Sequence, residues 1–297
     1  SLFNNFNVAA LTLKGFKQTL PAAPPLAIIA DIEIIKQAPP VMIQAGLGDL
    51  FGKYTALADW ELGRIIEDED YSPLIADQVR TVVDRAVHSF TNDISTEEKI
   101  THLTTALIMS GEAMLAWGNS RPASGSEHHL AHYWEMEAAL KGKAGHLHGV
   151  KVGIATMIVA DYYHRLFSLT IKEVEACVSI KRNESKNEYR NRIKTIFGPL
   201  AEMVLSDLNG YYCDLAQRKK RQIMIQNNWW LLKKLVIEKI PQPDQIKNSL
   251  RQSGAPCSPQ EIGISAAELE QALANAKEVR KRYTVFRLAE DLGWRSP

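Results

Sequence analysis

Histidines gather in one short stretch of this sequence. Five of the eight histidines fall between positions 128 and 148, namely His128, His129, His132, His146 and His148. His128 and His132 are four residues apart, so a helix would place them one turn from each other on the same face. Neutral imidazoles are good ligands for zinc, iron or nickel, and another ligand commonly comes from a distant part of the fold. The stretch therefore predicts a metal or catalytic site.

A helix start precedes the first of these histidines. Ser124 and Glu127 stand in the S-x-x-E relation, which predicts a capping box in which their side chains satisfy free backbone N–H groups. His148 lies twenty residues after His128, in a Gly-His-Leu-His-Gly loop that starts another apolar helix. His129 and His146 are expected to support the site or to have a structural role. His88, His102 and His164 have no partners in the sequence pattern and are expected to have no role in the site.

A carboxylate could complete the ligand set. Asp49 follows Gly46-Leu-Gly48 at the start of a predicted helix, and one carboxylate with two imidazoles is a common set for a metal with an open position. An aspartate at this place also favours the helix dipole without any ligand role. Lys53, four residues later, could form an ion pair with Asp49 or present a fixed positive charge to an anionic substrate. The sequence leaves both pairs of alternatives open.

The composition excludes several classes of protein. The chain has 297 residues, of which 45% are hydrophobic and 23% charged, as in an ordinary globular protein with a large core. Its net charge of +1 gives no support to a nucleic-acid or membrane-surface role. No apolar run reaches the ~18 residues of a membrane span. Cys177, Cys213 and Cys257 form no C-x-x-C pair, which favours a reducing, cytoplasmic setting.

Helical periodicity dominates after an N-terminal region of strands. Residues 8–20 indicate a hairpin or strand, 26–31 a short apolar strand, and 32–38 a helical turn. Ser95 and Glu98 mark one clear helix start. Helices are predicted at 41–63, 71–90, 96–117, 124–140, 150–167, 170–180, 183–208, 211–240, 244–252, 265–279 and 283–290. Glycine-rich phosphate loops and nucleophile elbows are absent from the sequence.

Several segments resemble sn-glycerol-1-phosphate dehydrogenases. The most specific are Ala45-Gly-Leu-Gly-Asp-Leu-Phe-Gly-Lys-Tyr-Thr-Ala-Leu-Ala-Asp-Trp60 and Ser124-Gly-Ser-Glu-His-His-Leu-Ala-His-Tyr-Trp-Glu-Met136. Segments 30–39, 148–153 and 281–294 add to the match, which runs from about residue 8 to the end. This family belongs to a wider group with iron-containing alcohol dehydrogenases, glycerol dehydrogenase and 3-dehydroquinate synthase. The resemblance implies a dinucleotide-binding α/β domain followed by a helical metal domain.

The resemblance also implies a domain division and a set of site residues. Residues 1–36 would be a strand remnant of the α/β domain, and residues 37–297 the helical metal- and substrate-binding domain, so the chain is expected to be mainly α. The family's metal ligands fall on Asp49, His128 and His148. His132 matches a substrate-contacting histidine, and Asp49 would contact substrate as well. Lys53 stands where the iron enzymes have a histidine ligand, which favours zinc over nickel or iron and adds Lys53 to the catalytic set.

The implied reaction is NAD(P)-dependent interconversion of glycerol 1-phosphate and dihydroxyacetone phosphate. The implied partners are a small phosphorylated polyol and further copies of the chain, without nucleic acid. Two alternatives remain: a relative acting on unphosphorylated polyols such as glycerol, and a non-catalytic metal-binding remnant. Activity with and without the phosphate group separates the two enzymes, and cofactor binding argues against the remnant.

The first prediction concerns binding of the nicotinamide cofactor. The family's Ser-Met-Asp-Gly-type segment normally precedes the Ala-Ala-Leu run, whereas residues 1–7 here contain neither aspartate nor glycine. We therefore expect most of the cofactor domain to be lacking, and we assign no cofactor-binding residue. Without a glycine-rich loop to hold the pyrophosphate, NAD and NADP should bind this chain weakly while metal binding survives. Calorimetric titration measures this, and low-micromolar affinity would contradict it.

Overall fold

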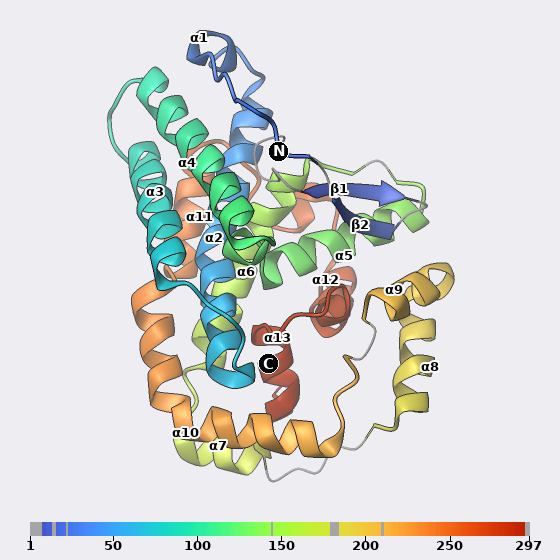
Figure 1. The fold of residues 1–297 in the computed structure, drawn as a ribbon. Helices are drawn as coiled ribbons and strands as arrows, with labels where there is room; N and C mark the ends of the chain where they lie inside the picture. The colour runs from blue at the N-terminus through green and yellow to red at the C-terminus, as the bar shows by residue number, and fades with distance from the viewer. Residues whose placement is uncertain are drawn as a thin grey trace.

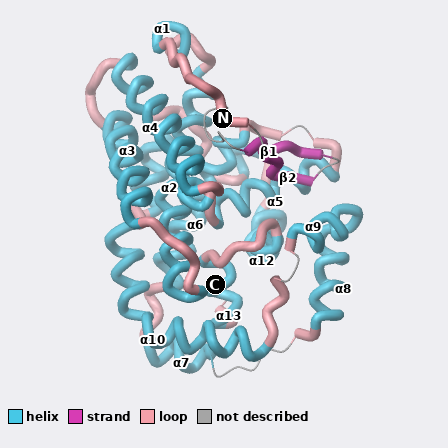
Figure 2. Tube along the Cα trace, viewed as in Figure 1, coloured by secondary structure: helices cyan, strands magenta, loops and turns pink. Residues whose placement is uncertain are grey.

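The computed structural model describes residues 8–13, 16–21, 23–143, 145–178, 184–208 and 211–294. Helices make up most of the described chain, as Figure 1 shows. The strands form one antiparallel hairpin, β1 (Val8–Leu13) and β2 (Phe16–Pro21), at one corner of the molecule next to α5 (Figure 2). The expectations of a mainly helical chain and of an N-terminal hairpin are confirmed.

The helical elements follow the predicted segments closely. No described helix combines the length and the apolar composition that a membrane span needs. The helices are α1 (Ile32–Ile35), α2 (Pro40–Glu67), α3 (Pro73–Thr91), α4 (Thr96–Trp117), α5 (Ser126–Leu140), α6 (His148–Leu166), α7 (Ile171–Val178), α8 (Lys186–Phe197), α9 (Ala201–Asp207), α10 (Leu215–Lys239), α11 (Pro243–Gln252), α12 (Ala266–Asn275) and α13 (Val285–Leu292), with 3-10 turns η1 (Arg121–Ala123), η2 (Gly198–Leu200), η3 (Gln260–Ile262) and η4 (Ala276–Glu278).

α2 and α6 pack with their backbones in direct contact at the centre of the molecule (Figure 1). A Cβ atom added to Gly48 on α2 would lie 2.3 Å from the carbonyl oxygen of Gly149 on α6. One added to Gly153 would lie 2.9 Å from the Cα atom of Gly48. The contact therefore requires glycine at these positions. It brings Asp49, the residue after Gly48, to the start of α6, where His148 lies.

Two predicted elements are wrong. Residues 26–31 form no strand, and the side chains of Leu26 and Ile29 are almost fully exposed, because no strand in the described part of the chain lies beside them. The helix predicted at 183–208 is divided into α8 and α9. Gly198 adopts a φ of 49°, and Pro199 cannot donate a helical hydrogen bond, so the chain turns at η2. The predicted helix ends at residues 179, 180 and 183 lie outside the described residues.

Gly149 tests the importance of the α2–α6 contact. In Gly149→Ala the new Cβ would lie 1.9 Å from a backbone carbonyl oxygen of α2, so the two helices must separate. We expect a loss of about 3 kcal/mol in the free energy of unfolding. Gly46→Ala is the matched control, since its Cβ would meet a leucine side-chain atom at an ordinary 3.4 Å. Urea denaturation measures both variants, and equal stabilities would contradict the prediction.

Candidate metal centre

Asp49 and Lys53 form a buried ion pair on α2. Lys53 Nζ lies 3.0 Å from Asp49 Oδ2, and the two side chains are 0% and 3% exposed. Lys53 Nζ also donates to the carbonyl oxygen of Ala123 in η1, at 3.2 Å. The i,i+4 spacing thus produces the ion pair, one of the two alternatives that the sequence left open for Lys53. Because Lys53 occupies one carboxylate oxygen of Asp49, the other oxygen, Oδ1, faces the histidines.

Two imidazole nitrogens approach Asp49 Oδ1 from two different helices. His128 Nε2 on α5 lies 3.4 Å from this oxygen, and His148 Nε2 at the start of α6 lies 4.0 Å from it. The ligand atoms of the three residues all fall within 4.8 Å of one another, so the group could hold one metal ion. His128 is buried and His148 is about one-quarter exposed, which leaves one side of the centre open to solvent.

A carboxylate fixes the orientation of each imidazole. His128 Nδ1 lies 2.7 Å from Glu127 Oε1, and His148 Nδ1 lies 2.8 Å from Glu135 Oε1. A proton on Nδ1 makes both contacts hydrogen bonds and leaves Nε2, which faces Asp49, as the nitrogen that could bind a metal ion. Sequence analysis gave Glu127 only a capping role and missed Glu135. Its place three residues after His132, on the same helix face, was the available signal.

The charges of the centre are strongly coupled. Burial alone would raise the pKa of Asp49, but Lys53 and His128 together hold it well below its usual range. Burial lowers the pKa of His128, yet hydrogen bonds with Asp49 and Glu127 raise it overall. Burial lowers the pKa of His148 despite the opposing effect of Glu135. Asp49 is therefore a carboxylate at neutral pH, which is the form that binds a cation.

His132 lies beside the three candidate ligands. Its ring stacks on that of His148, with centroids 5.2 Å apart. His132, Glu135 and His148 form a second group whose ligand atoms lie within 4.8 Å of one another. Burial, followed by the charge of Arg280, holds the pKa of His132 well below its usual range, so its imidazole is neutral. Among the described residues, neither metal-holding group includes His129 or His146, of which the second is exposed.

The predicted capping box at Ser124 and Glu127 does not form. Gly125 is the N-cap of α5 and makes no side-chain capping bond. Asp59 on α2 replaces the serine: its Oδ2 accepts hydrogen bonds from the backbone N and the Oγ of Ser126, both at 2.6 Å. Glu127 accepts from the backbone N of Gly125 at 2.7 Å. A buried carboxylate is a stronger hydrogen-bond acceptor than a serine hydroxyl, which explains why Asp59 rather than Ser124 accepts at the start of α5.

Several known proteins are similar to this chain in sequence. The chain is 34% identical over 280 residues to a glycerol-1-phosphate dehydrogenase of Geobacillus thermodenitrificans (strain NG80-2), covering 94% of this chain and 60% of that protein. It is 32% identical over 285 residues to the Bacillus subtilis (strain 168) enzyme of that name, covering 95% and 59%. A Methanothrix thermoacetophila relative is 42% identical over 161 residues, covering 53% and 43%. No family profile matches the chain.

The chain is a homologue of glycerol-1-phosphate dehydrogenases. This chain spans about 60% of the length of the Geobacillus thermodenitrificans and Bacillus subtilis proteins, and the matched region includes nearly all of this chain. Their names give NAD(P) as the coenzyme. The similarity confirms the resemblance inferred from the sequence, and the roles of Asp49, Lys53, His128, His132 and His148 stay predictions.

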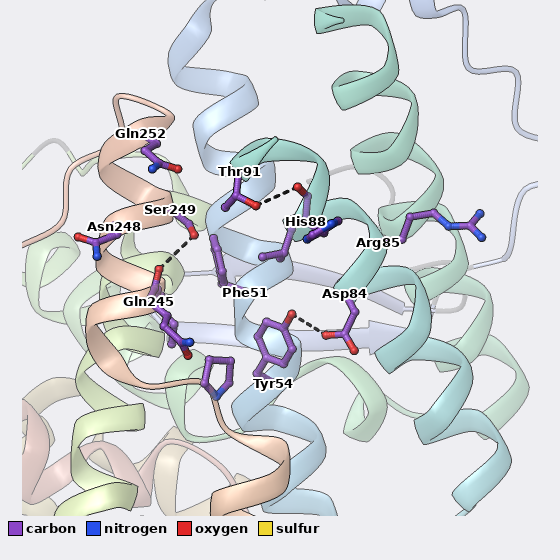
Figure 3. A pocket seen from close by; sticks show the side chains of 13 residues that line it. Phe51, Tyr54, Asp84, Arg85, His88, Thr91, Gln245, Asn248, Ser249 and Gln252 are labelled. Carbon is purple, nitrogen blue, oxygen red and sulfur yellow. Dashed lines mark hydrogen bonds between the residues drawn. The ribbon is translucent and has the colours of Figure 1, made fainter. Parts of the chain in front are cut away.

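A separate groove of about 760 Å³ lies between α2, α3 and α11 of this homologue. Figure 3 shows that Tyr54, Asp84 and His88 line it, with Gln245 and Ser249 on the facing helix. Tyr54 Oη donates to Asp84 Oδ1 at 2.7 Å. None of the three candidate metal ligands is among the lining residues, so the groove and the metal centre are distinct features.

Asp59 gives stability a defined pH dependence. Burial, followed by the charge of Glu127, raises the pKa of Asp59 to about 6. A folded-state pKa above the value of about 4 in unfolded chains contributes stability at low pH, which is lost as pH rises through about 6. We expect the unfolding free energy of the wild type minus that of Asp59→Asn to fall by about 2 kcal/mol between about pH 4 and about pH 7. Urea denaturation with a chelator present measures it; a constant or rising difference would contradict the assignment.

Proposed function

We propose that residues 37–297 are the metal- and substrate-binding domain of an NAD(P)-dependent sn-glycerol-1-phosphate dehydrogenase. The reaction interconverts glycerol 1-phosphate and dihydroxyacetone phosphate. The observation that carries the proposal is the convergence of Asp49 Oδ1 with the Nε2 atoms of His128 and His148. The domain division supports it too, since these residues all come from the helical part of the chain. Residues 1–36 belong to the α/β domain in this proposal.

The donor set fits zinc. One carboxylate and two imidazoles form a three-ligand set of the kind catalytic zinc sites use, and Glu127 and Glu135 supply the supporting carboxylates such histidines need. Nickel and iron use similar donors, so the assignment of zinc rests on Lys53 not being a ligand. When bound, the ion supplies a Lewis acid for the C2 oxygen of the substrate.

The neighbouring side chains have distinct tasks in this proposal. Asp49 binds the ion through Oδ1 and is held in place by Lys53 through Oδ2. His132, neutral and beside His148, hydrogen-bonds the substrate hydroxyl or passes its proton. Lys53 is fully buried and already contacts Asp49 and a carbonyl oxygen. Those contacts favour a role in fixing the ligand over direct contact with an anionic substrate.

Metal content tests the assignment. After loading with zinc and dialysis, the wild-type chain should retain about one ion, while His128→Ala and His148→Ala should lose most of it, because two ligands cannot replace the third. Glu135→Gln should weaken zinc affinity about 10–100-fold, since it supports a ligand without being one. Elemental analysis and competition with a chromophoric chelator measure these effects.

His88→Ala is the matched control for these variants. His88 is an exposed histidine on α3 that lines the separate groove, so its loss should leave zinc content unchanged. Full zinc occupancy in either ligand variant would remove the basis of the proposed function.

A further inference from the structure

An arginine-rich segment lies next to the metal centre. Residues 279–284 connect η4, which packs against α5, with the start of α13. Arg282 donates from Nη1 to the carbonyl oxygen of Ser124 at 2.7 Å and from Nη2 to Ser120 Oγ at 2.8 Å. The carbonyl oxygen of Ala123, in the same turn, accepts the hydrogen bond of Lys53. The segment and the ion pair of the metal centre thus meet at the turn before α5.

Arg280 stands apart from the other buried arginines. Arg121 pairs with Glu69, and Arg287 with Glu278. The half-buried side chain of Arg280, by contrast, has no hydrogen bond or ion pair with any residue that the structure describes. Arg282 contacts two neutral oxygens, and both burial and the charge of Arg280 lower its pKa. The charge of Asp207 acts on Arg280 without forming an ion pair with it. Two neighbouring guanidinium groups without a paired carboxylate are costly in a desolvated place unless an anion joins them.

Buried histidine nitrogens without hydrogen-bond partners lie on α5, near enough to these arginines for the arginine charges to affect the histidine pKa values. His129 is completely buried, and neither of its ring nitrogens has a partner in the described part of the chain. His132 is three residues further on, on the same face of the helix, and its Nδ1 is also buried without a partner. After burial, Arg282 and Arg280 act most strongly on the pKa of His129, and Arg280 acts on His132 as well. Buried polar atoms without partners are uncommon, and they suit a ligand that the protein binds.

We propose that Arg280, supported by Arg282, binds the phosphate group of the substrate in a subsite beside His132. The inference rests on the proposed function for the position of the reacting carbon at the metal centre. Guanidinium groups match phosphate oxygens through paired hydrogen bonds, and a dianion relieves the repulsion between the two arginines. The alternative cation, Lys53, is already neutralised by Asp49. Arg280 therefore selects phosphorylated over neutral polyols.

Calorimetric binding to the zinc-loaded 297-residue chain tests the proposal. Glycerol 1-phosphate and inorganic phosphate should each bind Arg280→Gln at least about 10-fold more weakly than the wild type, as expected for a lost charged hydrogen bond. Glycerol, which has no phosphate, should bind both proteins equally. Arg280→Lys keeps the charge without the forked geometry and should recover part of the affinity. Arg85→Gln, an exposed arginine on α3, is the matched control and should match the wild type.

The outcomes separate this proposal from the proposed function. If the wild type holds no zinc yet binds phosphate through Arg280, the metal assignment fails and the anion subsite stands. If zinc is bound and Arg280→Gln retains full phosphate affinity, the subsite is overturned. Absence of phosphate binding to the wild type overturns it as well. Thermal denaturation of each variant identifies misfolding, and Arg280→Lys provides the comparison if Arg280→Gln does not fold.

Discussion

The packing of α2 against α6 depends on positions that have no side chain. Gly48, Gly149 and Gly153 let the two backbones come closer than any larger residue allows. Asp49 follows the first of these glycines and His148 precedes the second, so the contact that packs the core also sets the distance between two candidate ligands. Small shifts of this interface would move both side chains together. A site built on packed helices is held more rigidly than one built on loops.

Asp59 fixes the third helix of the site. Its Oδ2 accepts from the start of α5, while its Oδ1 accepts from Tyr163 Oη on α6 and from the backbone N of Val285, the first residue of α13. One carboxylate therefore satisfies the N-termini of two helices and binds a third helix through a tyrosine. Four hydrogen bonds offset part of the cost of burying this charge. The position of His128 depends on this arrangement, because α5 begins only two residues before it.

Local structure could be predicted from the sequence, but contacts between residues that are far apart in the chain could not. Helical periodicity located α4 to the residue, with Ser95 as its cap, because both signals lie within a few positions of each other. It failed at residues 26–31, where an apolar run needs a neighbouring strand that is not there. The capping box at Ser124 failed because α5 begins later, at Ser126, whose backbone N–H donates to Asp59, more than sixty residues away. Spacing could suggest His128 and place Glu135 near His132, but it could not show that Glu135 binds His148, which belongs to another helix.

Negative and positive side chains are separated around the candidate metal centre, so a cation and an anion would be favoured at different places. Asp49, Glu127 and Glu135 surround the imidazoles with negative charge, which favours a cation there. Lys53 offsets part of that charge from inside the core, where its ammonium already donates to Asp49 and to a carbonyl oxygen. Arg282 donates to Ser124 and Ser120 just before α5, and neither Arg280 nor Arg282 forms an ion pair with a described carboxylate. The proposed substrate matches this separation of charge: its phosphate would meet the arginines, and its C2 oxygen would meet the cation that the carboxylate and imidazoles hold.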